Sequence, residues 1–169
     1  MMTRWYVVQT QPQAEAKAGW HLANQGFKCF LPRVVALRRH ARRVEPVLAP
    51  LFPRYLFANL NLDTTGWRAI NGTRGVVGLL TDGARPLAVP AGVVESLIVK
   101  SDSRGAVPLA ALGVFTKGTN VRIRAGTYAG QMGVVTEIPP AGSDRVLILL
   151  SLLGAEAELQ VPSYAIEAA

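Results

Sequence analysis

A short polar segment, residues 101–108, divides this chain of 169 residues into two parts. Its sequence, SDSRGAVP, is small, polar and helix-breaking, which is the composition of a tether. The chain is long enough for two small domains, because domains begin at about 50 residues. We therefore expect an amino-terminal domain over residues 1–100, a flexible linker over 101–112 and a carboxy-terminal domain over 113–169.

The charge is distributed unevenly between these parts. Residues 1–100 carry 13 Lys and Arg against 5 Asp and Glu, whereas residues 101–169 carry 5 against 6. Clustered cations attract polyanions over long distances, so the first domain is expected near nucleic acid; a merely solvated basic surface is the alternative. Hydrophobic residues make up 50% of the chain, which favours folded domains over disorder.

Several function classes are disfavoured by composition. A single cysteine, Cys29, excludes an internal disulfide framework and fits a reducing compartment, so a cytoplasmic protein is expected. The longest apolar run, residues 146–153, is broken by Ser151 and is too short to span a bilayer, so no membrane association is expected. Without paired carboxylates, metal-ligand spacing, a phosphate loop or a nucleophile motif, the sequence predicts no enzyme, no metal site and no cofactor.

The first hundred residues alternate between strand and helix patterns. Strands are predicted over residues 5–8, 27–37, 51–60 and 75–80, and helices over 10–26, 63–70 and 90–100. This order indicates an α+β fold of one sheet with helices. Thr10 and Gln13 have the spacing of a capping box at the start of the first helix.

The first helix has two contrasting faces. Ala16, Trp20 and Ala23 share the face that is expected to pack against the sheet. A polar stripe on another side of the helix consists of Gln13, Lys17, His21 and either Asn24 or Gln25. Such a stripe faces either a ligand or only water.

A basic turn follows the second predicted strand. It contains four arginines in six residues: Arg38, Arg39, Arg42 and Arg43. These side chains could neutralise about four phosphates of a single strand. The alternative is a solvated hairpin tip.

Four short strands are predicted in the last part of the chain, over residues 120–125, 133–138, 145–152 and 156–161. Turns that contain Gly or Pro separate them, which indicates a small barrel. Arg122 and Arg124 alternate with apolar residues and are expected to point outward. Gly126, Gly130 and Gly133 are expected to permit tight turns and close strand approach.

Several segments resemble a known family. WYVV at 5–8, PLFPRYLF at 50–57 and INGTRGV at 70–76 resemble the NusG amino-terminal domain, and GTNVRI at 118–123 with GTYAGQMGVV at 126–135 resembles the KOW module. The resemblance implies an α+β NusG-type domain followed by a small five-stranded KOW β-barrel. It also implies a non-enzymatic transcription elongation and antitermination factor. PLFPRYLF followed by NGTRGV is more similar to RfaH and other specialised paralogues than to the housekeeping factor.

The resemblance also implies partners. Phe52, Tyr55 and Phe57 match the apolar patch that binds the β′ clamp helices of RNA polymerase and thereby reduces pausing; the alternative is that they are core residues. The family's second contact, with the β subunit, is in question, because Gly66-Trp67-Arg68 replaces its motif. Trp67 either serves that contact or packs against the sheet.

A nucleic-acid contact is implied as well. Residues that match the positions contacting the non-template DNA strand are His21, Asn24, Gln25, Thr73 and Arg74. Gln11 and Asn24 stand where RfaH has basic residues, so any preferred DNA signal should differ.

For the KOW module, the resemblance implies recruitment of the ribosome through a small-subunit protein, or of termination factor Rho, by a monomeric factor. Gly133, Val134 and Val135 favour a stable barrel over a helical alternative of this module. A ribosome-associated KOW-type RNA-binding protein is the rival reading.

Overall fold

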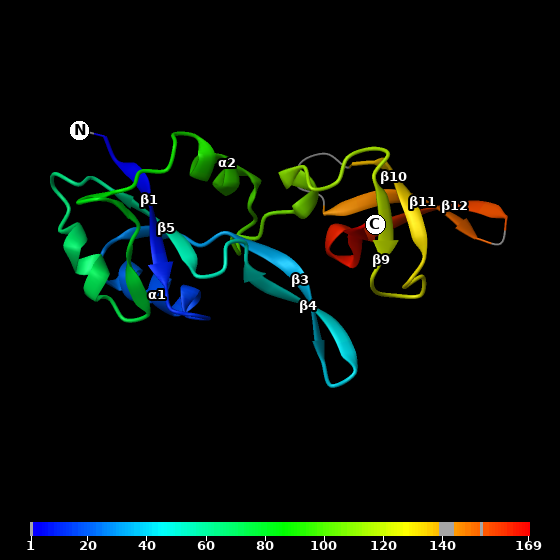
Figure 1. Ribbon diagram of the computed structural model, residues 1–169, viewed down its shortest axis with the longest axis horizontal. Coiled ribbons are helices and arrows are strands. Elements are labelled where there is room, and N and C mark those ends of the chain that lie inside the picture. The colour runs from blue at the N-terminus through cyan, green and yellow to red at the C-terminus, as the bar shows by residue number, and fades with distance from the viewer. Residues whose placement is uncertain (1, 139–143, 153) are drawn as a thin grey trace. The chain divides into compact units, whose positions relative to one another are not determined.

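The computed structural model describes residues 2–138, 144–152 and 154–169 (Figure 1). It contains two compact units. The amino-terminal unit comprises the chain up to Arg33 together with Ala49–Gly105, and the carboxy-terminal unit comprises Val34–Leu48 together with the chain from Ala106 onward. Among the described residues, no helix is both long and apolar enough to cross a bilayer.

The amino-terminal unit is built on a four-stranded sheet. Its strands are β1 (Arg4–Thr10), β2 (Lys28–Phe30), β5 (Tyr55–Leu60) and β6 (Val76–Leu79), in the order β2-β5-β1-β6. All three pairings are antiparallel. The predicted strand over 27–37 is divided, because the chain leaves the sheet at Leu31-Pro32 and starts β3 (Arg33–His40).

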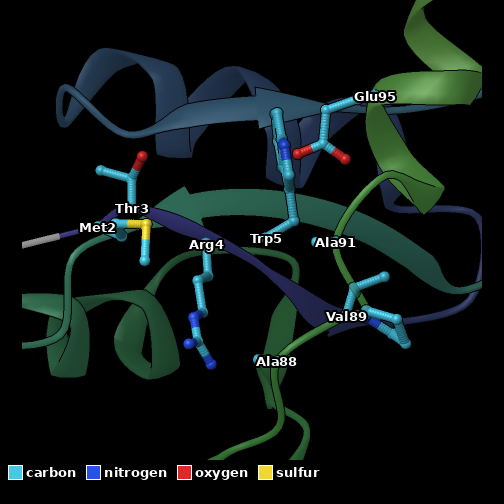
Figure 2. A pocket seen from close by; sticks show the side chains of 9 residues that line it. Met2, Thr3, Arg4, Trp5, Ala88, Val89, Ala91 and Glu95 are labelled. Carbon is cyan, nitrogen blue, oxygen red and sulfur yellow. The ribbon is translucent and has the colours of Figure 1, made fainter.

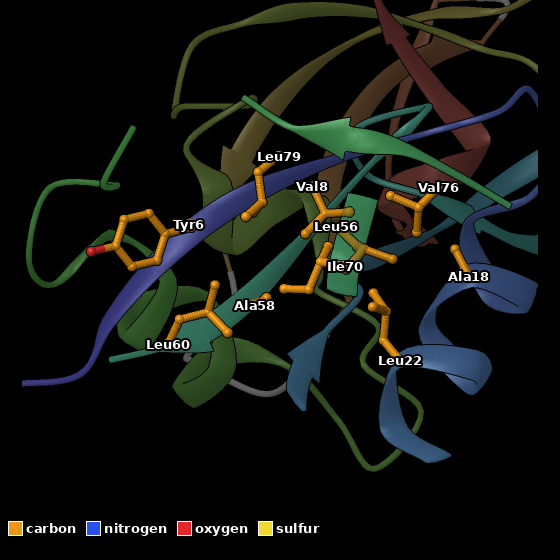
Figure 3. Close-up of a cluster of buried hydrophobic side chains, with 10 residues drawn as sticks. All are labelled: Tyr6, Val8, Ala18, Leu22, Leu56, Ala58, Leu60, Ile70, Val76 and Leu79. Carbon is orange, nitrogen blue, oxygen red and sulfur yellow. The ribbon is translucent and has the colours of Figure 1, made fainter. Parts of the chain in front are cut away.

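Three helical segments accompany this sheet: α1 (Glu15–Asn24), the 3-10 helix η1 (Trp67–Gly72) and α2 (Val93–Lys100). The small ribbon of β7 (Thr81–Asp82) and β8 (Arg85–Pro86) precedes α2. The main core lies on one face of the sheet, where Val8 and Leu56 pack with Leu22 of α1 and Ile70 of η1 (Figure 3). A helix is predicted over residues 63–70. The observed helix there, η1, is shorter and begins later in the chain.

Two predictions for the first helix are wrong. Thr10 ends β1 and α1 begins at Glu15, so Thr10 and Gln13 form no capping box; the cap residue is Ala14, without a side-chain hydrogen bond. The buried residues of α1 are Glu15, Ala18 and Leu22, whereas Ala16, Trp20 and Ala23 are exposed. Both sets have helical spacing, so periodicity alone could not decide which face turns to the sheet.

The segment after β2 forms a hairpin of β3 and β4 (Arg43–Pro50) (Figure 1). Its turn residues Ala41 and Arg42 have φ of 48° and 66°, the left-handed pair that a two-residue hairpin turn requires. The predicted basic turn is thus the tip of a hairpin. Arg38 and Arg39 lie near the end of β3, which ends at His40; Arg42 lies in the turn, and Arg43 is the first residue of β4.

The carboxy-terminal unit contains a five-stranded antiparallel sheet in the order β12-β11-β10-β9-β13. The strands are β9 (Asn120–Ile123), β10 (Met132–Glu137), β11 (Arg145–Leu152), β12 (Ala155–Pro162) and β13 (Ile166–Ala168). The four predicted strands are confirmed, and β13 supplies the fifth. Within the described part of the chain, no pairing between β12 and β13 closes the sheet into the expected barrel.

Backbone geometry explains two glycine predictions in this unit. Gly126 and Gly130 have φ of 91° and 89°, so both occupy the left-handed region as a tight turn requires. A Cβ atom on Gly133 would lie 2.7 Å from Leu150 Cδ2. Gly133 therefore permits the close approach of β10 and β11.

The predicted linker over 101–112 contains ordered contacts in its second half. The short helix η2 (Leu109–Leu112) lies there, and Ala110 packs into the core of the carboxy-terminal unit. The linker's flexibility and the exact domain boundaries stay predictions.

Candidate functional site

The sheet of the amino-terminal unit has two unlike faces. The register places Trp5 opposite Asn59, Val7 opposite Phe57 and Gln9 opposite Tyr55, so these six side chains share one face, here called the outer face. The inner face carries Tyr6, Val8, Leu56, Ala58 and Leu60 and belongs to the main core. On the outer face only Trp5 and Phe57 are buried, and the other four side chains are half-buried.

A tight turn leads into β5 at the edge of the outer face. Pro53 is its second residue, Arg54 its third residue with φ of 71°, and Tyr55 N donates to Phe52 O at 3.0 Å. These are the features of a type II turn. A non-glycine residue in this left-handed position is strained by about 1–2 kcal/mol.

Hydrogen bonds to neighbouring elements hold the strained turn. Glu15, buried at the start of α1, accepts a hydrogen bond from Arg54 N at 2.9 Å. Thr10 N donates to Arg54 O at 2.7 Å, and Arg54 Nε donates to Thr10 O at 3.3 Å. Sequence reasoning missed Glu15 and Arg54, because their contact joins residues 39 positions apart.

The three residues matched to the polymerase-binding patch differ in exposure. Phe52 is 41% exposed, Tyr55 is half-buried and Phe57 is only 7% exposed. The rings of Phe52 and Phe57 meet edge to face, with centroids 6.0 Å apart. Phe57 therefore has the core position that was the alternative for it, and it supports the exposed ring of Phe52.

The residues matched to DNA contacts come together along α1. Gln25 Nε2 donates to Thr73 Oγ1 at 2.9 Å, which joins the end of α1 to the loop after η1. Thr73 itself is buried and donates to Ala69 O at 3.0 Å. Arg74, Lys17 and Asn24 are exposed, and His21 is half-buried. We call this group the α1 polar surface. It consists of Lys17, His21, Asn24 and Gln25, on and at the end of α1, together with Thr73 and Arg74.

Trp20 lies within the same helix and is 64% exposed. Its ring and that of His21 are nearly perpendicular, with centroids 4.9 Å apart and an interplanar angle of 80°. Sequence reasoning placed Trp20 in the core. The sequence signal for its exposure was Leu22, an aliphatic residue on a different face of the helix. The two faces compete for burial against the sheet, and the face with Leu22 is the buried one.

The four arginines of the hairpin, Arg38, Arg39, Arg42 and Arg43, are all exposed. They belong to the segment Val34–Leu48, which is grouped with the carboxy-terminal unit, so they are described apart from the α1 polar surface.

Trp67 has the second of its two predicted roles. It packs against the main core, and the Arg68 guanidinium lies over its ring at 4.6 Å from the centroid. This stacking arrangement occupies one face of the indole.

A pocket of about 440 Å³ lies between the start of β1 and the loop before α2 (Figure 2). Trp5 and Glu95 are among its lining residues. Glu95 accepts a hydrogen bond from Gly92 N at 3.0 Å, so its carboxylate caps α2. The Glu95 carboxylate in this pocket therefore has a structural role as the cap of α2.

The single cysteine of the chain, Cys29, is a partly buried free thiol. Burial raises the pKa of the Cys29 thiol from 9.0 to about 11, which keeps it protonated at neutral pH. Among the described residues, no three His, Cys, Asp or Glu side chains are grouped so that they could hold a metal ion.

On the carboxy-terminal unit, Arg122 and Arg124 are exposed while Val121 and Ile123 are buried, as the alternation predicted. Arg124 Nε lies 3.6 Å from Glu167 Oε2. A shallow groove of about 260 Å³, lined partly by Met132 and Val134, crosses the outside of this sheet.

Comparisons with known proteins match both units. A family model described as "Transcription termination factor nusG" matches residues 3–98, and one described as "KOW motif" matches residues 117–148. The transcription termination/antitermination protein NusG of Thermus thermophilus is 29% identical, covering 95% of this chain and 96% of that protein. The protein of the same name from Deinococcus radiodurans is 26% identical with the same coverage. A solved structure of Thermotoga maritima NusG is 21% identical, with a TM-score of 0.42, covering 99% of this chain and 98% of that chain.

Proposed function

This chain belongs to the NusG family of non-enzymatic transcription termination and antitermination factors, and from that premise we propose that the outer face of its amino-terminal sheet binds RNA polymerase. The binding site is formed by Phe52 and Tyr55, with Phe57 beneath them. Its partner is the pair of clamp helices of the β′ subunit. Binding there holds the clamp closed and suppresses pausing.

The exposure of Phe52 and Tyr55 is the observation that carries this proposal. Aromatic side chains contribute strongly to small interfaces, because they bury a large apolar area at a low cost in conformational entropy. Phe52 is held on a turn that three hydrogen bonds anchor, so its position is set before binding.

We test this proposal with Tyr55→Ala in a pull-down of core RNA polymerase. The variant should retain its circular dichroism spectrum and lose polymerase binding. Tyr128→Ala is the matched control, since Tyr128 is an exposed aromatic residue of the other unit and should leave binding unchanged. Polymerase binding by Tyr55→Ala at the wild-type level contradicts the proposal.

The α1 polar surface serves as the contact for the non-template DNA strand. Lys17 and Arg74 supply positive charge for phosphates, and His21, Asn24 and Gln25 supply hydrogen-bonding groups for base edges. Thr73 acts by holding Gln25, because its hydroxyl is already buried in hydrogen bonds to Gln25 and Ala69. His21→Ala and Arg74→Ala should weaken cross-linking to the displaced strand in a paused complex, whereas an unchanged cross-link opposes this role.

The hairpin arginines contribute to the affinity for the non-template DNA strand by neutralising its phosphates. Four neutralised phosphates of a single strand give a slope of about −3 for the logarithm of the binding constant against that of the salt concentration. Replacing Arg38, Arg39, Arg42 and Arg43 by Ser should flatten this slope. An unchanged slope would show that the hairpin arginines do not bind DNA phosphates.

The KOW unit recruits a second partner, either a small-subunit ribosomal protein or Rho. The groove beside Met132 and Val134 offers exposed apolar area for that contact. Specialisation of the RfaH kind rests on the PLFPRYLF and NGTRGV segments. An in vitro elongation assay tests it, because a specialised factor reduces pausing only on templates that carry its DNA signal.

A further inference from the structure

The unexpected exposure of Trp20 adds a specific contact to the α1 polar surface. We propose that Trp20 is a stacking platform for one unpaired base of single-stranded DNA. This inference rests on the proposed function of α1 as a DNA contact and goes beyond it, because the matched positions of the family do not include Trp20.

The geometry of Trp20 suits stacking. The indole is 64% exposed, and its ring contact among the described residues is with His21 at an interplanar angle of 80°, so His21 can cover at most one face of the indole. Stacking on an aromatic side chain is available to every base, since every base has a flat π face.

A groove beside the ring accommodates the base. It has a volume of about 220 Å³ and runs between α1 and the strand that follows it. Ala16, Gly19 and Ala23 contribute small side chains on the helix side, and Trp20 and Arg33 are larger lining residues. A flat ring can therefore lie against the indole while its sugar and phosphate remain outside.

The charge around the groove favours a nucleic-acid strand over an acidic peptide or an apolar protein segment. Lys17 lies one helical turn from His21 and is exposed, and Arg33 lines the groove. The only carboxylate of α1, Glu15, is buried and hydrogen-bonded to Arg54 N. The exposed part of the helix thus presents one cation, Lys17, and no anion to an approaching phosphate.

The stacking contact requires an unpaired base. Bases inside a duplex have both faces covered by their neighbours, so Trp20 cannot reach them without unstacking. Trp20 should therefore contribute to binding of single strands and not of duplexes, and the contribution should depend weakly on base identity.

Tryptophan fluorescence of the full chain tests the proposal directly. A mixed-sequence single-stranded DNA 12-mer should quench the emission of the exposed Trp20, and the same sequence as a duplex should not. Trp20→Phe should lose this quenching, because it removes the reporter, and should keep the affinity measured by anisotropy of labelled DNA. Trp20→Ala should weaken that affinity about tenfold. Val99→Ala, at an exposed apolar residue of α2, is the matched control.

Two results separate failure of this inference from failure of the proposed function. If Trp20→Ala binds single strands like the wild type while His21→Ala and Arg74→Ala bind weakly, the stacking role is wrong and the α1 polar surface stands. If the wild type does not bind the single strand, or none of these variants differs from it, both are wrong. If Trp20→Ala instead weakens binding of polymerase without nucleic acid, the groove holds a protein segment and the stacking role is also wrong.

Discussion

The two faces of the amino-terminal sheet are made by the same strands and differ in how far their side chains are buried. On the inner face, Val8 and Leu56 are fully buried beneath α1 and η1. On the outer face, Tyr55 directly precedes Leu56 in the chain but remains partly exposed. It lies near the exposed ring of Phe52. Because one face alone supplies the main core, the other can keep aromatic residues available for a partner. Under the proposed function, the alternation of a strand separates the residues that form the core from those that bind a partner.

The largest effect is expected from the inner face. Leu56→Ala should destabilise the amino-terminal unit by about 3 kcal/mol, because it leaves a cavity beneath α1. Urea unfolding monitored by circular dichroism measures this loss. Tyr55→Ala, one residue away, should cost about 1 kcal/mol or less. Equal losses from the two variants would show that the faces do not differ.

The chemical reactivity of Cys29 provides a second comparison of the faces. Cys29 is paired with Ala58 and packs against the inner-face core, and burial raises its pKa to about 11. At pH 8 its reaction with iodoacetamide should be about a hundredfold slower than that of an unperturbed thiol, since only the thiolate reacts. The control is Gln9→Cys in a Cys29→Ser background, which places a thiol on the outer face and should react faster.

The same raised pKa sets a direction for stability against pH. The folded protein keeps the Cys29 proton at pH values where the unfolded chain releases it. Stability therefore falls as the pH rises from about 9 to about 11, and Cys29→Ser should remove this part of the decrease. An identical decrease in both proteins would assign it to other groups.

A smaller loss of stability is expected when the hydrogen bond between Arg54 N and Glu15 is removed. Glu15→Ala leaves Arg54 N without its acceptor and should cost about 2 kcal/mol. It should also weaken polymerase binding, because the turn that holds Phe52 loosens. Glu15→Gln keeps an acceptor oxygen and should cost less. Arg54→Gly should offset about 1 kcal/mol of the loss by relieving the left-handed strain; no recovery would mean that the turn is not strained.

Local patterns were sufficient to predict much of the fold. The alternation in residues 145–152 and the glycines at 126 and 130 required only neighbouring residues, and both predictions hold in the structure. The exposure of Arg122 and Arg124 follows from the same alternation. In the amino-terminal unit, residues 5–8 were enough to predict β1.

Contacts between distant residues determined what local patterns missed. Which face of α1 is buried depends on the packing of Ala18 and Leu22 in one core with residues far along the chain, such as Ile70 and Val76. Helical periodicity is equally compatible with burial of Trp20 or of Leu22. In the structure Leu22 packs into the core and Trp20 is exposed. Glu15 is buried because Arg54 N reaches it, and no property of residues 10–26 indicates that partner.

The most direct test of the outer face is a photo-crosslink from position 55 itself. Replacing Tyr55 by p-benzoylphenylalanine keeps an aromatic ring at the proposed contact, and the same residue at Tyr128 is the control. On ultraviolet irradiation with core RNA polymerase, position 55 should cross-link to the β′ subunit and position 128 should not. A factor that still binds polymerase but gives no cross-link from position 55 would contradict the assignment of this face as the binding surface.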